Sequence, residues 1–360
     1  MALSRLRFFP PGYRRVKSLL VSDEQLPFFE ENTGDTRPRR TRRNRRPLII
    51  GLSVLLVALV AVGGMIAFYV KSGMDALNQV ERDPNLTPTN TNRPTPVEPQ
   101  VDEKSAPINF VLMGSDSRGD ERGRSDVLQL LHIPGSRDAA YLLSIPRDSW
   151  VDIPGHDKGK INWAYSFGGP ALTVETLESL LDVPMDHTVI INFDGFKNVI
   201  DALGGISVYN RHESASQGFT FPKGEIRLSG EEALVFVRER YNLPSGDFDR
   251  AERQRDVIKA IVKQLASAGV LANPAKFSEV VSALGPQFTV DQGLTNNTIL
   301  DLAMTSSSAF GNIHSMGLPN LGPGWAGTQS IVRVDWNAID QLKIALRNDD
   351  MASFFEAHGG

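Results

Sequence analysis

The feature that most constrains this chain is a stretch without a single charged residue, from Leu48 to Val70. It runs for about 23 residues, and about 20 apolar residues in a helix are enough to cross a bilayer. A cleaved signal peptide would have an apolar region of about 7–15 residues followed by a small-residue cleavage pattern, which Lys71-Ser72-Gly73-Met74 lacks. A buried core helix is the other alternative. We therefore predict one N-terminal transmembrane helix over residues 48–70.

The charges beside this stretch predict its orientation. Seven arginines lie immediately before it, whereas Lys71 and Arg82 after it are mixed with acidic residues. Because positive charge is retained on the cytoplasmic side, we expect the N-terminus in the cytoplasm and the rest of the chain outside the cell membrane. The arginines could instead form a nucleic-acid patch, and binding to anionic membrane lipid could coexist with the topological role. The net charge of −4 gives no support for a nucleic-acid partner.

Composition divides the chain further. Residues 1–47 are basic and are predicted to be a disordered cytoplasmic segment. Residues 71–106 are rich in Pro, Thr, Asn and acids, which is typical of an extended extracytoplasmic tether that cannot form a core. Residues 107–350 are predicted to form one domain with a sizeable core, and residues 351–360 a C-terminal tail. Cysteine is absent, which excludes disulfides, thiolate metal sites and a cysteine nucleophile.

From residue 107 onward, short apolar runs alternate with helical patterns. This favours an α/β (α+β) fold, with a central mixed β-sheet flanked by helices. The predicted strands cover residues 108–113, 127–133, 140–145, 188–193, 206–209, 313–317 and 331–334. The predicted helices cover residues 172–181, 196–203, 249–268, 274–284, 295–310 and 335–346, and another begins after Ser229 as its N-cap.

The helix predicted over residues 249–268 directs two polar side chains inward. Ile258, Ile261 and Leu265 recur at helical spacing and mark its buried face. The same stripe, extended towards the N-terminus, reaches Gln254 and Arg250. The remaining charged residues fall on other faces, where we expect solvent: Glu252, Arg253, Arg255, Asp256, Lys259 and Lys263. A buried arginine needs a partner, which could be a ligand or, alternatively, a structural ion pair with Asp247 or Glu239.

Other charged residues lie near the ends of predicted strands. Asp116 and Arg118 follow one apolar run, Arg147 follows another, and Asp126 precedes a third. Ligand-binding groups commonly lie just beyond strand ends in open α/β sheets, although any one aspartate could be a turn or cap residue. Arginines that converge with aspartates suit a diphosphate with a divalent cation, and carboxylate oxygens suit Mg²⁺.

Arg238 and Arg240 form a second pair of candidates. They share one face if the backbone there is extended, with Glu239 opposite. The planar fork of arginine matches phosphate oxygens better than lysine does. A solvated Arg-Glu-Arg surface run is the alternative.

Several of these segments, in this order, resemble the LytR–CpsA–Psr family. They are Asn109–Arg118, Ser125–Val127, Ser144–Asp148, Lys160–Tyr165 and Arg238–Gln254. Members of that family are cell-wall ligases of Gram-positive bacteria, which move a glycopolymer from a polyprenyl diphosphate carrier to peptidoglycan. The resemblance implies a membrane-anchored, Mg²⁺-dependent phosphotransferase that forms a phosphodiester and releases polyprenyl phosphate.

The resemblance also implies roles for individual residues. Asp116 and Asp126 would hold Mg²⁺, with Lys160 and Asp247 near the diphosphate. The cradle for the diphosphate would be Arg118, Arg147, Arg238, Arg240, Arg250 and Gln254. The proton of the attacking sugar hydroxyl has two candidate acceptors, Asp116 and Asp247. The sequence does not identify the residues that line a lipid channel.

Two other functions remain compatible with the same residues. A Mg²⁺-dependent polyprenyl-diphosphate pyrophosphatase would give the same leaving group to water. A non-catalytic cell-surface regulator would tolerate loss of the aspartates. The reaction product discriminates the three: a phosphodiester-linked wall polymer, free monophosphate, or neither.

Overall fold

The structure is a computed structural model that describes residues 64–65, 67–89, 93–98, 105–115, 125–265 and 273–359. The predicted cytoplasmic segment and most of the predicted transmembrane helix lie outside the described residues. Residues 67–77 are helical. Within the described ranges, no helix combines the length and the apolar character that crossing a membrane requires.

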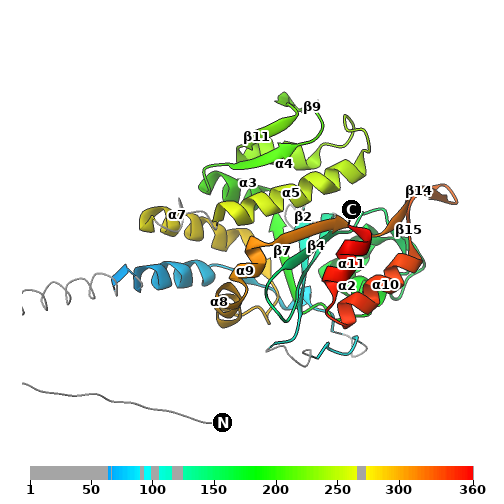
Figure 1. Ribbon diagram of the computed structural model, residues 1–360, viewed down its shortest axis with the longest axis horizontal. Coiled ribbons are helices and arrows are strands. Elements are labelled where there is room, and N and C mark those ends of the chain that lie inside the picture. Colours follow the sequence, from blue (N-terminus) through cyan, green and yellow to red (C-terminus); the bar gives the residue numbers. More distant parts are fainter. Residues whose placement is uncertain are drawn as a thin grey trace, which may run out of the picture. The chain divides into compact units, whose positions relative to one another are not determined.

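A seven-stranded mixed sheet organises the domain, as predicted (Figure 1). Its strand order is β1-β12-β7-β2-β3-β4-β13. β2 is parallel to β7 and antiparallel to β3, and β13 is parallel to β4. The strands are β1 (Glu81–Arg82), β2 (Ile108–Ser115), β3 (Ser125–Ile133), β4 (Ala140–Ser144), β7 (His187–Asn192), β12 (Phe288–Val290) and β13 (Ile313–Gly317).

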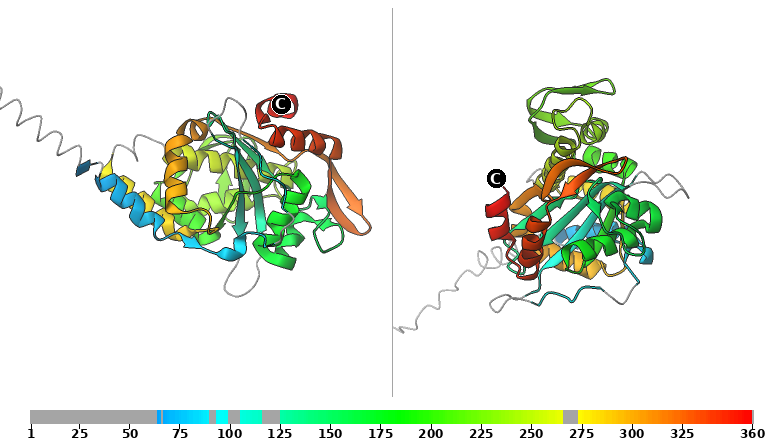
Figure 2. Two further views of the ribbon diagram at one scale, coloured as in Figure 1. Left: turned by 90° about the horizontal axis from the view of Figure 1, so that it is seen from below. Right: turned by 90° about the vertical axis from the view of Figure 1, so that its right-hand side faces the viewer.

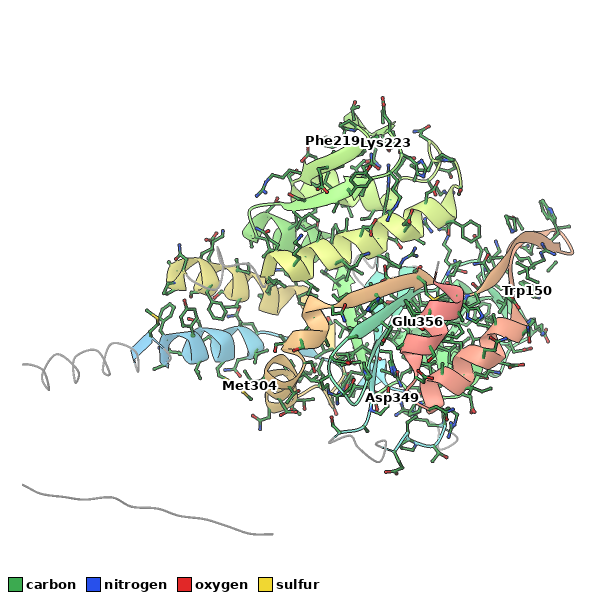
Figure 3. The ribbon with its side chains drawn as sticks, in the orientation of Figure 1. Trp150, Phe219, Lys223, Met304, Asp349 and Glu356 are labelled. Carbon is green, nitrogen blue, oxygen red and sulfur yellow. The ribbon has the colours of Figure 1, made fainter. Side chains whose placement is uncertain are left out.

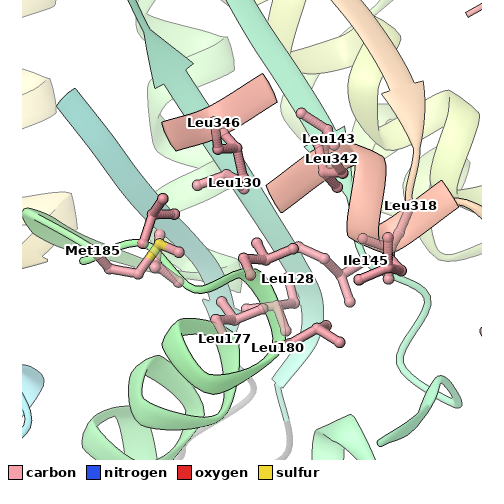
Figure 4. Close-up of a cluster of buried hydrophobic side chains, with 14 of the residues drawn as sticks. Leu128, Leu130, Leu143, Ile145, Leu177, Leu180, Met185, Leu318, Leu342 and Leu346 are labelled. Atoms are coloured by element: carbon pink, nitrogen blue, oxygen red, sulfur yellow. The ribbon is translucent and has the colours of Figure 1, made fainter. Parts of the chain in front are cut away.

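Three helices cover one face of this sheet. They are α2 (Ile161–Leu181), α10 (Trp336–Arg347) and α11 (Met351–His358). Alternate residues of β3, such as Leu128 and Leu130, point to this face and pack with Leu177 and Leu342 (Figure 4). This cluster is the main hydrophobic core.

The opposite face supports a second group of elements (Figure 2). Its helices are α3 (Phe193–Ala202), α4 (Gly230–Arg238), α5 (Asp247–Leu265), α7 (Pro274–Leu284), α8 (Asn296–Thr305) and α9 (Ser307–Gly311). Two short antiparallel sheets accompany them, β8 (Ile206–Asn210) with β11 (Gly224–Leu228) and β9 (Ser214–Ser216) with β10 (Phe219–Phe221). Ser229 caps α4 through a capping box with Glu232, which confirms its predicted role.

The remaining small elements lie at the margins of these layers. They are the 3₁₀ turns η1 (Pro84–Leu86) and η2 (Gly285–Gln287) and the paired strands β5 (Trp150–Val151) with β6 (Gly159–Lys160) and β14 (Asn320–Ala326) with β15 (Gln329–Val334). The helix predicted over residues 172–181 is longer than expected, since α2 begins at Ile161. It is kinked at Gly169, whose φ of 70° suits glycine, just before Pro170.

The segment predicted to be a tether is packed against the domain along much of its described length. Glu81–Arg82 pairs in parallel with β12, at the edge of the main sheet. Leu86 is only 2% exposed, and Arg93 Nε donates to the buried carboxylate of Glu178 at 3.0 Å. The composition of residues 71–106 could not predict these contacts, because each is made with residues about eighty or more positions away in the sequence.

The predicted C-terminal tail is also structured, since most of it forms α11. Asp350 caps this helix by accepting from the Ser353 N–H, and Met351 and Phe354 are buried in the main core. Before the helix, Asp349 lies close to the buried His132, with 2.9 Å between Oδ1 and Nε2. Figure 3 shows Asp349 and Glu356 at the two ends of this region. The apolar spacing of Met351 and Phe354 was the available signal.

Candidate active site

Three strand ends meet at one edge of the sheet. Because β2 and β7 are parallel and in register, Ser115 lies beside Asn192. β4 runs in the same direction as β2, and Arg147 follows its end by three residues. Asn192 also begins α3, where its side chain accepts the Gly195 N–H at 2.7 Å. The prediction that Arg147 lies beyond a strand end is confirmed.

An apolar cavity of about 430 Å³ opens between the sheet and the α3–α4–α5 layer. Leu112 and Val189 line it from the sheet, and Phe196 and Leu234 from α3 and α4. Its other apolar lining residues are Met113, Val127, Ile191, Phe193, Val199, Val237, Val257, Ile258, Ile261, Val262, Leu265 and Phe288. An apolar cavity of this size accommodates part of a hydrocarbon chain.

Four arginines line the same cavity: Arg147, Arg238, Arg240 and Arg250. They come from the loop after β4, from the end of α4 and from α5. The described structure thus brings together four of the five predicted diphosphate-binding arginines. The fifth, Arg118, lies outside the described residues.

The first turns of α5 face this cavity, as predicted. Arg250 is 7% exposed, and its Nη2 lies 2.6 Å from Asp247 Oδ1. Asp247 Oδ1 is also 3.9 Å from Arg147 Nε, so one carboxylate lies between two arginines. Gln254 is buried and donates to the Val237 carbonyl at 3.2 Å. Arg250 therefore both lines the cavity and forms the ion pair with Asp247 that was the alternative to a ligand.

The prediction that Arg253 faces solvent is wrong. Arg253 is 6% exposed, and its Nη2 donates to Asn210 Oδ1 at 3.0 Å and to Ser214 Oγ at 3.0 Å. The guanidinium also lies 4.1 Å from the ring centroid of Phe236, and burial lowers its pKa to about 10. The helical stripe marked only one buried face, whereas β8 and β9 cover another.

Arg255 is half-buried rather than fully solvated. Its Nη1 donates to Ser144 Oγ at the end of β4. Burial lowers the pKa of Arg255, although Glu252 and Asp256 act in the opposite direction. Together with Arg253, it shows that α5 is enclosed on more than one side.

The Arg238-Glu239-Arg240 segment is built around its buried carboxylate. Glu239 is 5% exposed and accepts the Tyr241 and Asn242 N–H groups at 2.9 and 3.2 Å. Burial acts to raise the pKa of Glu239, but hydrogen bonds from Ser216 and from these backbone groups outweigh it and lower the pKa. The glutamate therefore fixes the turn, which places both arginines at the cavity.

The two arginines of this segment also contact aromatic rings. Arg238 lies 4.4 Å from the ring centroid of Phe193, and Arg240 lies 4.4 Å from that of Tyr241. These contacts orient the guanidinium planes without neutralising their charge. The alternative of a purely solvated surface run does not describe this segment, because its central residue is buried.

Lys160 lies near Arg147 but outside the apolar cavity. Its Nζ is 3.0 Å from Asp148 Oδ1, and Asp148 Oδ2 is 3.8 Å from Arg147 Nε. These residues line an adjoining pocket, which shares Arg147 with the apolar cavity. Lys160 is therefore connected to the arginine cluster through one aspartate.

The two predicted Mg²⁺ ligands are Asp116 and Asp126. Asp116 lies outside the described residues. Asp126 belongs to β3, beside Val127, which lines the cavity. Among the described residues, no group of three or more histidines, aspartates or glutamates is arranged to hold a metal ion. The Mg²⁺ site stays a prediction.

Sequence reasoning missed several residues at the site. Tyr241 and Asn192 line the cavity, and Asp148 lies between Lys160 and Arg147. Asp148 directly follows Arg147 in the sequence, so its position was a usable signal. The apolar lining comes from strands and helices far apart in the chain, and only the tertiary structure assembles it.

This chain is similar to several known proteins in sequence and in structure. The polyisoprenyl-teichoic acid–peptidoglycan teichoic acid transferase TagU of Bacillus cereus (strain AH820) is 34% identical over 280 residues, which are 77% of this chain and 89% of the relative. The crystal structure of B. subtilis TagV has a TM-score of 0.60 at 30% identity, over 69% of this chain and 98% of that one. A structure of TagT bound to LI-WTA has a TM-score of 0.58 at 26% identity, over 73% and 98%.

The family comparison covers most of the domain. The LytR_cpsA_psr family matches residues 70–348. That range includes every described arginine of the cavity, the whole main sheet and the segment before β2 that packs against it. This chain belongs to the LytR–CpsA–Psr family.

Proposed function

We propose that this protein is a glycopolymer–peptidoglycan phosphotransferase. It takes an anionic polymer of the teichoic acid class from a polyprenyl diphosphate carrier, attaches it to peptidoglycan and releases polyprenyl phosphate. The names of relatives such as TagU support the substrate class. The observation that carries the proposal is an apolar cavity that four arginines also line. In a lipid diphosphate, the hydrocarbon chain matches the apolar lining of that cavity and the diphosphate matches its arginines.

The reaction is a displacement at phosphorus. A sugar hydroxyl of the acceptor attacks the phosphorus nearest the polymer, and the bond from that phosphorus to the bridging oxygen breaks. The new phosphodiester stays on the peptidoglycan, and polyprenyl phosphate leaves with the bond electrons. The hydroxyl proton passes to a carboxylate, for which Asp247 and Asp116 are the two candidates. Arg147, Arg238, Arg240 and Arg250 stabilise charge on the transferred and departing phosphates.

We propose that the transfer reaction uses Mg²⁺. Asp116 and Asp126 would hold it, since their hard carboxylate oxygens suit this ion. Asp126 is adjacent in β3 to a residue that lines the cavity, so its place in the chain fits this role. When bound, Mg²⁺ would supply additional positive charge for the diphosphate.

The same proposal places the protein at the cell membrane. A single N-terminal span with a cytoplasmic N-terminus would leave the domain outside the cell, where a lipid-linked diphosphate carries its own leaving group. Protease added to intact protoplasts should then remove the region after residue 71. Full protection of that region would contradict the topology.

The function is tested with full-length protein, a polyprenyl diphosphate-linked glycopolymer, peptidoglycan and Mg²⁺. The proposal predicts a phosphodiester-linked wall polymer together with polyprenyl phosphate. Release of polyprenyl monophosphate without attachment to peptidoglycan would instead identify a pyrophosphatase. Absence of any turnover, with binding retained, would identify a regulator.

A further inference from the structure

A second pocket adjoins the arginine cluster at Arg147. It has a volume of about 550 Å³. We call this space the aromatic pocket. It is lined by Arg147, Asp148, Lys160, Asn162, Trp163, Ser166 and Phe167. Arg147 also lines the apolar cavity, and it is the one residue common to both linings as described. The two spaces therefore meet at a phosphate-binding side chain.

Aromatic rings line one part of this pocket. Phe167 is 44% exposed, which is high for so large an apolar side chain. Its ring stacks on His156 at 4.6 Å and lies 6.3 Å from that of Trp163, which in turn contacts Trp150 edge-on at 6.1 Å. Figure 3 places Trp150 on the side of the domain that carries β14 and β15. These contacts hold the rings in place before any ligand arrives.

Polar groups line the rest of the same pocket. Asp148 and Lys160 form an ion pair at 3.0 Å, and Asn162 and Ser166 come from the first turns of α2. The Asn162 N–H donates to the Arg147 carbonyl at 3.2 Å, which ties the start of α2 to the arginine loop. Rings that offer a flat apolar face beside hydroxyl, amide and charged groups suit a pyranose, which has a C–H face and a rim of hydroxyls.

The geometry of phosphoryl transfer indicates whether this sugar belongs to the donor or to the acceptor. The attacking and leaving oxygens lie roughly in line across the phosphorus. Under the proposed function, the leaving polyprenyl phosphate has its chain in the apolar cavity. The attacking hydroxyl must then approach the phosphorus from outside the apolar cavity. The aromatic pocket is a second space that is lined by the same Arg147.

We propose that the aromatic pocket binds the acceptor glycan, with a sugar of the peptidoglycan strand stacked on Phe167 and Trp163. This inference rests on the proposed function and adds a site for its second substrate. Phe167 and Trp163 position the sugar, and Asp148, Lys160, Asn162 and Ser166 bond its hydroxyls. The bound sugar presents its attacking oxygen towards the phosphorus held at Arg147.

The test is a kinetic comparison of Phe167→Ala with a matched control. Tyr209→Ala removes another exposed aromatic side chain, 52% exposed on β8, which lines neither space. Transfer is measured with soluble peptidoglycan oligomers as acceptor and a lipid-linked glycopolymer as donor. For Phe167→Ala, the KM for the acceptor should rise at least fivefold and the KM for the donor less than twofold. Tyr209→Ala should leave both within twofold of wild type.

Rescue separates binding from folding. Phe167→Tyr keeps the ring and should restore most of the acceptor affinity, whereas Phe167→Leu keeps the apolar volume and should not. Thermal unfolding of each variant shows whether the fold is retained. If Phe167→Leu binds acceptor as well as Phe167→Tyr does, stacking is not the mode of recognition and the inference fails.

The outcomes also separate this inference from the proposed function. Wild-type protein that transfers no polymer contradicts the function itself. Wild-type transfer with an unchanged acceptor KM in Phe167→Ala contradicts the acceptor site alone. A rise confined to the donor KM would assign the pocket to the first sugars of the donor and would also overturn the inference.

Discussion

Two faces of the same helix, α5, carry buried arginines with different surroundings. Arg250 and Arg253 are 7% and 6% exposed, so burial alone does not distinguish them. Arg250 lies on the cavity face, is paired with Asp247 and lines the apolar cavity. Arg253 lies on the face covered by β8 and β9, where Asn210, His212 and Ser214 accept its hydrogen bonds. It is not among the described residues that line the cavity.

The difference separates a binding role from a structural one. The acceptors around Arg253 are supplied by the protein itself, and the ring of Phe236 covers its guanidinium. Around Arg250, three further arginines line the same cavity. Like charges gathered in a cleft are costly unless an anion binds there. We therefore expect the cavity face to bind an anionic ligand and the opposite face to contribute to stability.

The largest effect should come from the two predicted Mg²⁺ ligands. Asp116→Ala and Asp126→Ala should each remove most transfer activity in Mg²⁺ and leave the melting temperature close to that of wild type. The reason is that, in the proposed mechanism, a Mg²⁺ held by these two residues would offset diphosphate charge beyond what the arginines offset. Single-turnover rates with Mg²⁺ as the only metal measure this. Near-normal turnover in either variant would remove that aspartate from the metal site.

Arg250→Lys is the next test, because it keeps the charge on the cavity face. A lysine offers a point charge in place of a forked donor. We expect the transfer rate to fall on the order of a hundredfold, as for other losses of transition-state stabilisation. The melting temperature should change little. A variant that is unstable but fully active per folded molecule would show that the pair with Asp247 is only structural.

Arginine-to-lysine substitution on the face covered by β8 and β9 should reduce stability and leave activity nearly unchanged. Arg253→Lys cannot reach the same set of acceptors, and leaving buried groups unsatisfied costs about 2 kcal/mol. For a domain of this size, that is a fall of roughly 4–8 °C in melting temperature. Activity per folded molecule should stay within about twofold of wild type. Calorimetry and kinetics on one preparation check both parts.

A bulky substitution in the apolar lining of the cavity tests whether this lining binds the lipid chain. Ile261→Trp adds bulk to a lining residue, and we expect the KM for a long-chain polyprenyl diphosphate donor to rise about tenfold. Binding of inorganic diphosphate should change much less, because the arginines are retained. Equal effects on both ligands would show that the substitution disturbs the arginines rather than the lipid chain.

Glu239, which lies between the cavity arginines Arg238 and Arg240, should give the smallest effect. Its lowered pKa means that its ionised form stabilises the fold. That contribution is present above the usual pKa of 4.5 and is lost as the pH falls through the lower folded value. The melting temperature of Glu239→Gln should therefore depend less on pH below about 4.5 than that of wild type. Parallel pH profiles for the two proteins would contradict this.

Sequence patterns predicted the parts of the fold that depend on local periodicity. The strands β2, β3 and β4 and the inward position of Arg250 and Gln254 followed from apolar spacing. The burial of Arg253 did not, because a helix enclosed on two sides has polar residues on its second buried face. Long-range partners, such as β12 for Glu81–Arg82, leave no trace in composition.

The candidate site also contains residues that the sequence predicts and residues that only the tertiary structure reveals. Its arginines were predictable because each follows or begins a recognisable element. The apolar cavity was not, since its described lining comes from four strands, β2, β3, β7 and β12, and from the three helices α3, α4 and α5. Asp148 and Tyr241 are adjacent in sequence to predicted residues, but only their contacts reveal a role.

The central claim is that the cavity face of α5 binds a lipid diphosphate and the opposite face does not. Equilibrium binding of a short-chain prenyl diphosphate to wild type, Arg250→Lys and Arg253→Lys tests it most directly. The account predicts that Arg250→Lys binds at least tenfold more weakly, a loss of about 1.4 kcal/mol, and that Arg253→Lys binds within twofold of wild type. Equal affinity in all three proteins, or equal weakening in both variants, would contradict it.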